Sequence, residues 1–366
     1  MKFTCNREIL LKEVSIAQEI IASKNAISIW SNIYLETKDS SLIIKATDRN
    51  VNFQTEIPVT VIESGATTIF VDKFFGFLNT LSCEEIEFIL KDNIAITKPV
   101  MQNKPKCELK IIASEKFPEF PVSAVPFFEM PIKDFKEMVQ NSVFAISDDE
   151  TRYFMNGVFF EKTEDKINMV ATDGRRLAFV TKPAGSKIED FSGIIIPPKI
   201  LNLIVKRSGD EGIISISVND KSIFINFASY KFSSVLIEGN FPNYKKVIPE
   251  SQEHNLIIKR DELLKALRSV SLMVEKQSHR IYLIISPGKM EIYPEKNELG
   301  IVEAEIPCQY DGEEVTIALN YRYLEEPFKV MTDSEVKLCF TSATKAMTIQ
   351  PVPEKDFFHI IMPMQS

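Results

Sequence analysis

The sequence predicts an α+β fold in which one unit of about 125 residues is used three times. The run LIIKATD at 42–48 recurs 125 residues later as INMVATD at 167–173, and TEIP at 55–58 recurs as VTKP at 180–183. A fainter third copy includes IYLII at 281–285. Self-similarity at a fixed spacing indicates one structural unit, and a spacing this long indicates whole domains.

Each unit is expected to hold two helices packed on antiparallel sheet. Leu10, Val14, Ala17 and Ile21 lie at helical spacing and form one apolar face. The longer helices are expected at 7–24, 131–147 and 259–276, and the shorter ones at 70–82, 196–208 and 319–332. Pro327 is expected to break the last of these. Alternating runs such as ISISV at 214–218 predict strands with one polar face.

Two linker-like stretches divide the units, VSAVP at 122–126 and PESQE at 249–253. The predicted domains are therefore 1–124, 127–248 and 254–366. A chain of 366 residues is too long for one ordinary domain, which agrees with this division.

Composition excludes several classes of protein. No apolar run reaches membrane-spanning length, and the start MKFTCNREILLKE is not a signal peptide, so no membrane partner is expected. The five cysteines are scattered and never form a CxxC pair, which indicates reduced thiols in a cytoplasmic protein. The net charge of −8 argues against a conventional basic nucleic-acid binder.

The charge is unevenly distributed between helices and the rest of the chain. The six expected helices hold 16 Lys and Arg against 11 Asp and Glu, although the whole chain is acidic. Two interpretations of this bias are about equally good. In the first, it reflects charge pairing at helix ends and chance. In the second, the helices line a common face that contacts a polyanion.

Candidate catalytic groups are few. The three histidines are not at metal-ligand spacing, and no GxSxG or phosphate-loop motif is present. Asp148, Asp149 and Glu150 could form a Mg²⁺ site of a nucleic-acid enzyme, but a solvated loop at a helix exit is the stronger interpretation. No catalytic residue, metal or cofactor is therefore expected.

The stretch MVATDGRRLAFV at 169–180 places an Asp-Gly pair and two arginines between two strand-like runs. Asp-Gly between such runs is a strong hairpin signal. From the residue types alone, a plain hairpin is favoured over a functional loop, and both remain open.

A set of short motifs, in order along the chain, resembles a known family. They are MKFT at 1–4, Arg152-Tyr153 with Asn156-Gly157, ATDGRRLA at 171–178, FPNY at 241–244, and Met362-Pro363-Met364. The chain resembles, from end to end, the β subunit of bacterial DNA polymerase III, the replicative sliding clamp. The resemblance implies three clamp domains per chain, two chains closed head to tail into a ring, and helices lining its hole.

The resemblance also implies a hydrophobic pocket between domains two and three for a Gln-Leu-x-Leu-Phe-like partner peptide. The matching residues are Met155, Thr172, Gly174, Arg175, Arg176, Leu177, Pro242, Lys246, Val247, Thr344, Ala346, Ile360, Met362, Pro363 and Met364. Arg175 stands where His is frequent in the family and Lys246 where Arg is frequent, so this chain departs from the common pattern at two pocket positions. The implied partners are the DNA polymerase III alpha subunit, the clamp loader and repair polymerases.

Two further sets follow from the resemblance. Contacts to double-stranded DNA correspond to Lys24, Lys73, Arg152, Tyr153 and Lys199. Arg152 could instead be a surface salt-bridge residue. The homodimer interface is expected to join Cys107 and Leu109 of one chain to Leu272 and Met273 of the other. Such a protein is a non-catalytic subunit.

Overall fold

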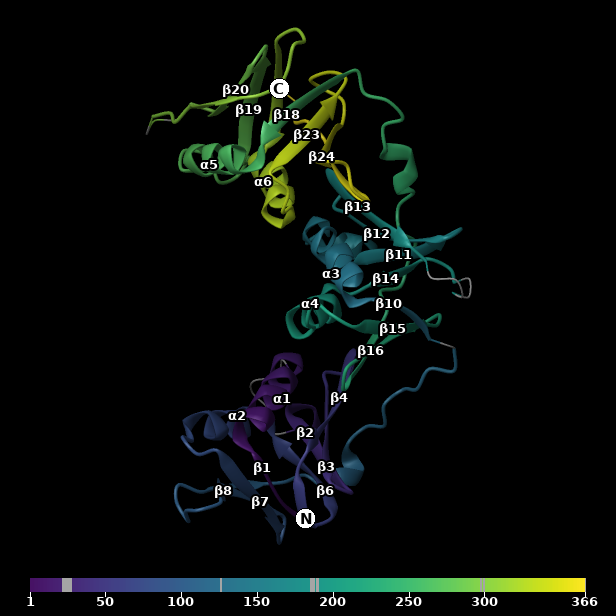
Figure 1. The fold of residues 1–366 in the computed structure, drawn as a ribbon, viewed down its shortest axis with the longest axis vertical. Helices are drawn as coiled ribbons and strands as arrows, with labels where there is room; N and C mark the ends of the chain where they lie inside the picture. The colour runs from purple at the N-terminus through teal and green to yellow at the C-terminus, as the bar shows by residue number, and fades with distance from the viewer. Residues whose placement is uncertain are drawn as a thin grey trace. The chain divides into compact units, whose positions relative to one another are not determined.

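The computed structural model describes residues 1–21, 28–125, 127–184, 188, 191–296, 298 and 300–365. The chain divides into two compact units (Figure 1). Unit one contains Met1–Pro131 and Ser208–Leu236, and unit two contains Ile132–Arg207 and Ile237–Ser366. The second sequence repeat therefore contributes strands to both units.

Unit one is built on two sheets. Its eight-stranded sheet has the order β10-β15-β16-β17-β4-β3-β2-β6, and its five-stranded sheet has the order β5-β1-β7-β8-β9. The elements are β1 (Lys2–Asn6), α1 (Arg7–Ile20), η1 (Ile29–Ser31), β2 (Asn32–Lys38), β3 (Ser41–Thr47), β4 (Val51–Pro58), β5 (Thr60–Glu63), β6 (Gly65–Phe70), α2 (Val71–Thr80), β7 (Glu85–Lys91), β8 (Ile94–Pro99), β9 (Cys107–Lys110), η2 (Ser114–Lys116), β10 (Phe128–Pro131), β15 (Ile213–Val218), β16 (Ser222–Phe227) and β17 (Tyr230–Val235).

Unit two repeats this plan. Its eight-stranded sheet has the order β14-β11-β12-β13-β25-β24-β23-β18, and its four-stranded sheet has the order β21-β20-β19-β22. The elements are α3 (Ile132–Gln140), η3 (Val143–Ala145), η4 (Glu150–Met155), β11 (Val158–Thr163), β12 (Lys166–Thr172), β13 (Arg176–Pro183), β14 (Ile194–Ile196), α4 (Pro198–Arg207), η5 (Tyr244–Val247), β18 (His254–Lys259), α5 (Arg260–Ser271), β19 (Arg280–Ser286), β20 (Lys289–Pro294), β21 (Ala304–Pro307), β22 (Val315–Asn320), α6 (Tyr321–Val330), β23 (Glu335–Phe340), β24 (Met347–Val352) and β25 (Phe357–Ile361).

Helix α1 shows how the local sequence sets the core of unit one. Asn6 caps the helix, because its side-chain oxygen accepts hydrogen bonds from the backbone N–H groups of Glu8 and Ile9. The apolar face that contains Leu10 and Val14 is buried, and α1 packs against α2 and against β3 and β4. The face of β3 and β4 opposite α1 therefore takes no part in this helix packing.

Each eight-stranded sheet crosses from one sequence repeat to the next. In unit one, β4 of the first repeat pairs with β17 of the second, and in unit two β13 of the second pairs with β25 of the third. Asn52 faces Ser233 in the first pairing, and Leu177, which lies 125 residues after Asn52, faces Ile360 in the second. We call the pairing of β4 with β17 the first junction and the pairing of β13 with β25 the second junction. The two junctions are equivalent in backbone register, so their residues can be compared position by position.

The predicted α+β architecture is confirmed, but four details of the helices were wrong. The helix expected at 7–24 ends at Ile20. The helix expected at 131–147 ends at Gln140, where the hydroxyl of Ser142 donates to the carbonyl of Met138 and competes with the helical pattern. The helix expected at 259–276 ends at Ser271. Pro327 lies inside α6 and does not break it.

With these bounds the charge bias of the helices is smaller than the sequence indicated. The six described α-helices hold 13 Lys and Arg against 10 Asp and Glu. Helix α4 accounts for the excess, because it carries three basic residues and no acidic one. No α-helix in the described part of the chain is long and apolar enough to cross a membrane.

Candidate functional site

The stretch at 169–180 forms the predicted hairpin, in which β12 pairs with β13 as far as Thr172 and Leu177. The turn is built by the side chain of Asp173, whose Oδ1 accepts hydrogen bonds from the backbone N–H groups of Arg175 and Arg176 at 2.8 and 3.0 Å. Gly174 has a φ of 87°, a conformation that glycine adopts without strain. Asp173 therefore builds the turn, and Gly174 adopts its positive φ without strain.

The first repeat contains the same turn 125 residues earlier. Asp48 Oδ1 accepts from the backbone N–H groups of Asn50 and Val51, and Arg49 takes the place of Gly174 with a φ of 84°. The Arg49 guanidinium lies 4.6 Å from the centre of the Trp30 ring. The turn is thus a structural component of the repeat, and any function at 169–180 depends on the residues around it.

Arg176 connects the hairpin to α6. Its guanidinium forms ion pairs with Asp173 and Glu326, donates to the carbonyl of Phe144 at 2.7 Å, and lies 4.6 Å from the centre of the Tyr323 ring. Only 11% of its side chain is exposed. Arg175 is exposed, so the adjacent arginines have different environments.

We expect Arg176→Met to destabilise unit two by roughly 3 kcal/mol, because it leaves the carboxylates of Asp173 and Glu326 without their common partner. Arg176→Lys should recover little, since an ammonium cannot make the same fork of hydrogen bonds. Urea unfolding of the two variants measures this effect. Arg175→Met is the matched control and should change stability by no more than about 0.5 kcal/mol. Equal effects at the two positions would contradict the structural role of Arg176.

A buried apolar cluster lies beside the hairpin and includes several of the expected pocket residues. Its buried members are Val170, Leu177, Tyr244 and Ile360, and its partly buried members are Phe159, Phe179, Phe241, Ile248, Ala346 and Phe358. The ring of Phe241 stacks on that of Phe159 at 4.7 Å, and the ring of Phe179 on that of Phe358 at 5.0 Å. The cluster brings β12, β13 and β25 together with the segment that links the second and third repeats.

Tyr244 is held in this cluster by a polar contact. Its hydroxyl donates to the carboxylate of Glu161, and burial together with this carboxylate raises the pKa of Tyr244. Phe241 and Tyr244 belong to the FPNY motif, but neither they nor Phe159, Phe179 and Phe358 were among the predicted pocket residues. The short apolar runs of β13 and β25 were the signal available for Phe179 and Phe358.

The C-terminal segment forms one side of this region. After β25 ends at Ile361, the Met362 N–H donates to the Arg175 carbonyl at 2.9 Å, and the Met364 N–H donates to the Ala318 carbonyl at 2.8 Å. Met362 remains 41% exposed, and Val247 remains 50% exposed. Exposed apolar side chains next to a rigid apolar cluster suit the binding of an apolar peptide.

The remaining expected pocket residues differ in position. Met155 is buried at the end of η4, and Thr172 is buried with its hydroxyl donating to the Arg176 carbonyl at 2.6 Å. Thr344 and Lys246 are exposed, and Pro242 and Pro363 are partly buried. The structure thus groups Leu177, Ala346 and Ile360 directly, whereas the role of the whole set stays a prediction.

His359 lies on β25 between Phe358 and Ile360. Its side chain is fully buried, its ring is 5.3 Å from that of Phe144, and neither ring nitrogen has a hydrogen-bond partner among the described residues. Burial lowers the pKa of His359 to about 3. The imidazole is therefore neutral at physiological pH, and β25 places no charge under the apolar cluster.

The residues expected to contact DNA are divided between the two units. Lys73 is exposed on α2 of unit one, and Lys24 lies outside the described residues. In unit two, Lys199 is partly buried in the first turn of α4, and Tyr153 is 53% exposed. Arg152 pairs with Asp149 at 2.9 Å and donates to the Asp173 carbonyl at 3.1 Å, so it has a structural role whether or not it meets DNA.

The central carboxylate of the acidic run at 148–150 is engaged in local contacts. Asp149 caps η4 by accepting from the backbone N–H and the hydroxyl of Thr151, and these bonds, with the Arg152 ion pair, hold the pKa of Asp149 below its usual value. Within the described ranges, no group of three or more His, Cys, Asp or Glu side chains could hold a metal ion. These contacts do not favour the Mg²⁺ interpretation.

The residues expected at the dimer interface lie at two accessible places. Strand β9, which contains Cys107 and Leu109, is an outer strand of the five-stranded sheet, and both side chains are partly buried. Leu272 follows α5 and is 79% exposed, and Met273 is partly buried. An outer strand and an exposed leucine are surfaces that proteins commonly cover.

Comparisons with known proteins agree along the whole chain. Sequence models of the N-terminal, central and C-terminal domains of the DNA polymerase III beta subunit match residues 1–121, 129–243 and 245–365. The beta sliding clamp of Treponema pallidum is 44% identical over 100% of both chains. The beta subunit structure from Borrelia burgdorferi, in complex with a natural product, has a TM-score of 0.92 and 26% identity and covers 100% of this chain and 99% of that one.

A more distant structure shows the same fold. The sliding clamp from Pseudomonas aeruginosa bound to griselimycin has a TM-score of 0.94 at 22% identity, with 100% of both chains covered. Three domain matches in order, together with a full-length relative at 44% identity, leave one assignment. The chain belongs to the DNA polymerase III beta subunit family.

Proposed function

We propose that two copies of this chain close head to tail into a ring around duplex DNA and tether polymerases and other proteins through a peptide pocket. As a beta subunit, the chain is a sliding clamp and not an enzyme. The observation that carries the proposal is the full-length match to the Treponema pallidum beta sliding clamp, with all three domains in order.

The acidic character of the chain is compatible with this function. A ring that surrounds DNA is held by its closed shape, so it needs only weak and non-specific contacts to phosphates. Helix α4, with Lys199, Lys206 and Arg207 and no acidic residue, can supply such contacts. Lys24, Lys73, Arg152, Tyr153 and Lys199 are the proposed DNA contacts.

The proposed peptide pocket is centred on the apolar cluster beside the hairpin. Leu177 and Ile360 form its rigid base, and the exposed side chains of Val247 and Met362 are available to a partner. Methionine adapts to different apolar partners, and the buried aromatic residues keep the base rigid. One pocket can therefore accept peptides from several proteins.

The proposed partners are the alpha subunit of DNA polymerase III, the clamp loader and repair polymerases. A ring of two chains offers two pockets, so two partners can be tethered together and exchange at high effective concentration. A cytoplasmic location and domain boundaries near residues 124–127 and 248–254 belong to the same proposal.

The function is tested by primer extension on a primed single-stranded circle, with the clamp loader and polymerase of the same bacterium. Adding the chain should lengthen the products of a single binding event manyfold, because a tethered polymerase does not leave the template. The loader without ATP is the control, since no ring should then be placed on the circle. Products of unchanged length with the complete mixture would contradict the proposed function.

A further inference from the structure

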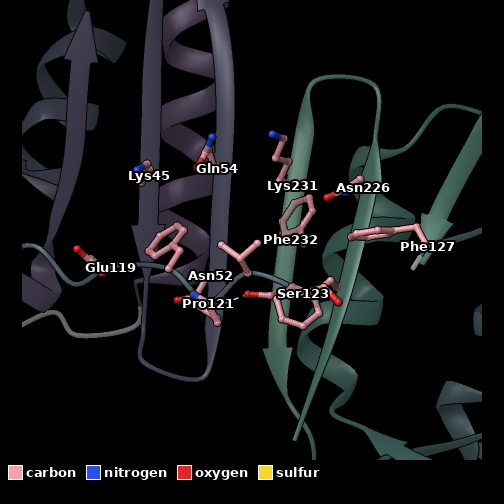
Figure 2. Close-up of a pocket in the computed structure, with 14 residues that line it drawn as sticks. Lys45, Asn52, Gln54, Glu119, Pro121, Ser123, Phe127, Asn226, Lys231 and Phe232 are labelled. Carbon is pink, nitrogen blue, oxygen red and sulfur yellow. Dashed lines mark hydrogen bonds between the residues drawn. The ribbon is translucent and has the colours of Figure 1, made fainter. Parts of the chain in front are cut away.

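Unit one contains a groove of about 550 Å³ that the proposed function does not use (Figure 2). One wall is the eight-stranded sheet, and the other is the segment 119–123 together with Phe127. The wall residues Lys45 and Gln54 alternate along their strands with buried Ile44 and Phe53. The groove therefore lies on the face of the sheet opposite α1.

A row of polar side chains crosses four strands at the base of this groove. Lys45 of β3 faces Gln54 of β4, Gln54 faces Lys231 of β17, and Lys231 faces Asn226 of β16. Figure 2 shows the four side chains side by side across the strands. Because neighbouring strands lie about 4.8 Å apart, the backbones at Lys45 and Lys231 are separated by roughly 10 Å.

The polar groups of this row have no polar partners. Among the described residues, the side chains of Gln54, Asn226 and Lys231 form no hydrogen bond or ion pair, and the Lys45 ammonium lies only over the Tyr34 and Phe120 rings at 5.1 and 5.8 Å. Glu119 also lines the groove, but it is exposed and pairs with neither lysine. The groove thus presents two ammonium groups and two amides in a chain of net charge −8.

Three of the four equivalent positions in unit two have the opposite character. At the same register of the second junction, Val170 pairs with Phe179, and Phe179 with Phe358. The correspondence, by the 125-residue spacing and by strand pairing, is Lys45 to Val170, Gln54 to Phe179, Lys231 to Phe358, Asn52 to Leu177 and Ser233 to Ile360. One backbone frame therefore carries an apolar cluster at the second junction and a polar groove at the first.

The covering segment keeps one aromatic contact at both junctions, since the ring of Phe117 lies against Tyr34 as the ring of Phe241 lies on Phe159. It differs at the next aromatic residue, because Tyr244 is buried in the apolar cluster of unit two and its counterpart Phe120 lines the groove of unit one. In unit one, the segment is held by the ring of Phe117 against Tyr34 at 5.4 Å and by the hydroxyl of Ser123 at 2.6 Å from that of Ser217. Between these two anchor points, the row of polar side chains remains accessible in the groove.

We propose that this groove binds an extended acidic segment of a partner protein. Two carboxylates of the segment pair with Lys45 and Lys231, and its backbone bonds to the amides of Gln54 and Asn226, which can both donate and accept. An apolar side chain of the segment contacts Phe127, which is 41% exposed. We favour an acidic peptide over a nucleic acid, because the amides of Gln54 and Asn226 suit the backbone of an extended segment and the exposed Phe127 suits an apolar side chain.

The test uses the intact chain and the fluorescein-labelled peptide Asp-Phe-Asp-Leu-Asp, followed by fluorescence anisotropy. The peptide should bind with saturation, and its Asn-Phe-Asn-Leu-Asn analogue should not. Lys45→Gln with Lys231→Gln should weaken binding at least about fivefold, because it removes both proposed ion pairs. Raising the salt from low to physiological ionic strength should weaken binding of the acidic peptide to the unsubstituted chain.

Lys38→Gln with Lys221→Gln is the matched control, since it changes the charge equally at exposed lysines of unit one that do not line the groove. This control should bind as the unsubstituted chain does. No saturable binding, or equal loss in both double variants, would overturn the proposal. Displacement by Gln-Leu-Ser-Leu-Phe would assign the acidic peptide to the other junction, and tighter competition by oligothymidine would assign the groove to nucleic acid. Either result overturns the proposal without affecting the proposed clamp function.

Discussion

A chain that lacks residues 362–366 is expected to lose partner-peptide binding by at least about 30-fold while it keeps its fold. The deletion begins after β25 ends at Ile361, so every strand pairing of unit two is retained. It removes the exposed side chain of Met362 and the backbone of Pro363 and Met364, where the glutamine of the peptide is expected to lie. A buried anchor of this kind commonly contributes about 2 kcal/mol or more.

The measurement is titration of a labelled Gln-Leu-Ser-Leu-Phe peptide against the full chain, the truncated chain and Met362→Asp. Met362 tests peptide binding more specifically than Leu177, because Leu177 is only 3% exposed and an aspartate there would also destabilise the core. Met101→Asp is the matched control, since Met101 is 93% exposed in unit one. If the truncated chain and the full chain bind the peptide alike, the pocket assignment is wrong and 169–180 is only a structural hairpin.

Leu109→Asp together with Leu272→Asp is expected to convert the dimer into a folded monomer of 41.7 kDa. Each chain offers two different surfaces, β9 with Leu109 and the end of α5 with Leu272, and such a head-to-tail pairing must close into a ring or continue as a chain. Aspartates on both surfaces place an unpaired charge in each contact. Sedimentation at low micromolar concentration distinguishes the two masses.

The control for the dimer prediction is Ile62→Asp. Ile62 is 53% exposed on β5, the outer strand at the opposite edge of the same five-stranded sheet. This variant should remain a dimer. A double variant that still sediments as a dimer places the interface elsewhere than β9 and the end of α5.

The repeat was predictable because its chemistry is local. The Thr-Asp pair at 47–48 and at 172–173 builds the same turn through side-chain bonds to the next few backbone N–H groups, which depend on a few adjacent residues. The helices were predictable from apolar spacing, and α4 begins at Pro198 as a proline in the first turn predicts. The family resemblance then supplied the order of domains.

Features that depend on distant residues were not predictable in the same way. Arg176 bonds to Glu326, which is 150 residues away, and Tyr244 bonds to Glu161, which is 83 residues away. Nothing in the local sequence distinguishes Arg176, which is largely buried, from the exposed Arg175 beside it. The early end of α3 also escaped prediction, because the apolar pattern continues through Val143 and Phe144 after the helix has ended.

The row of polar side chains in the groove could not be predicted from the sequence repeat. The sequence alignment of the first two repeats matches strand to strand, but only the register across β3, β4, β17 and β16 reveals Lys45, Gln54, Lys231 and Asn226 as one row. Lys231 is 186 residues from Lys45 in the chain, and the two residues lie close together only because β4 of the first repeat pairs with β17 of the second. Equivalent positions can thus acquire opposite chemistry within one fold.

If the chain holds DNA by surrounding it, it should be retained on circular DNA and lost from linear DNA. A ring loaded on a nicked circle should remain bound through a wash at 1 M salt, which abolishes weak phosphate contacts, and should be released when the circle is cut to a linear molecule. The measurement is the amount of chain that elutes with the DNA before and after cutting. Equal loss from circular and linear DNA under that wash would contradict the ring.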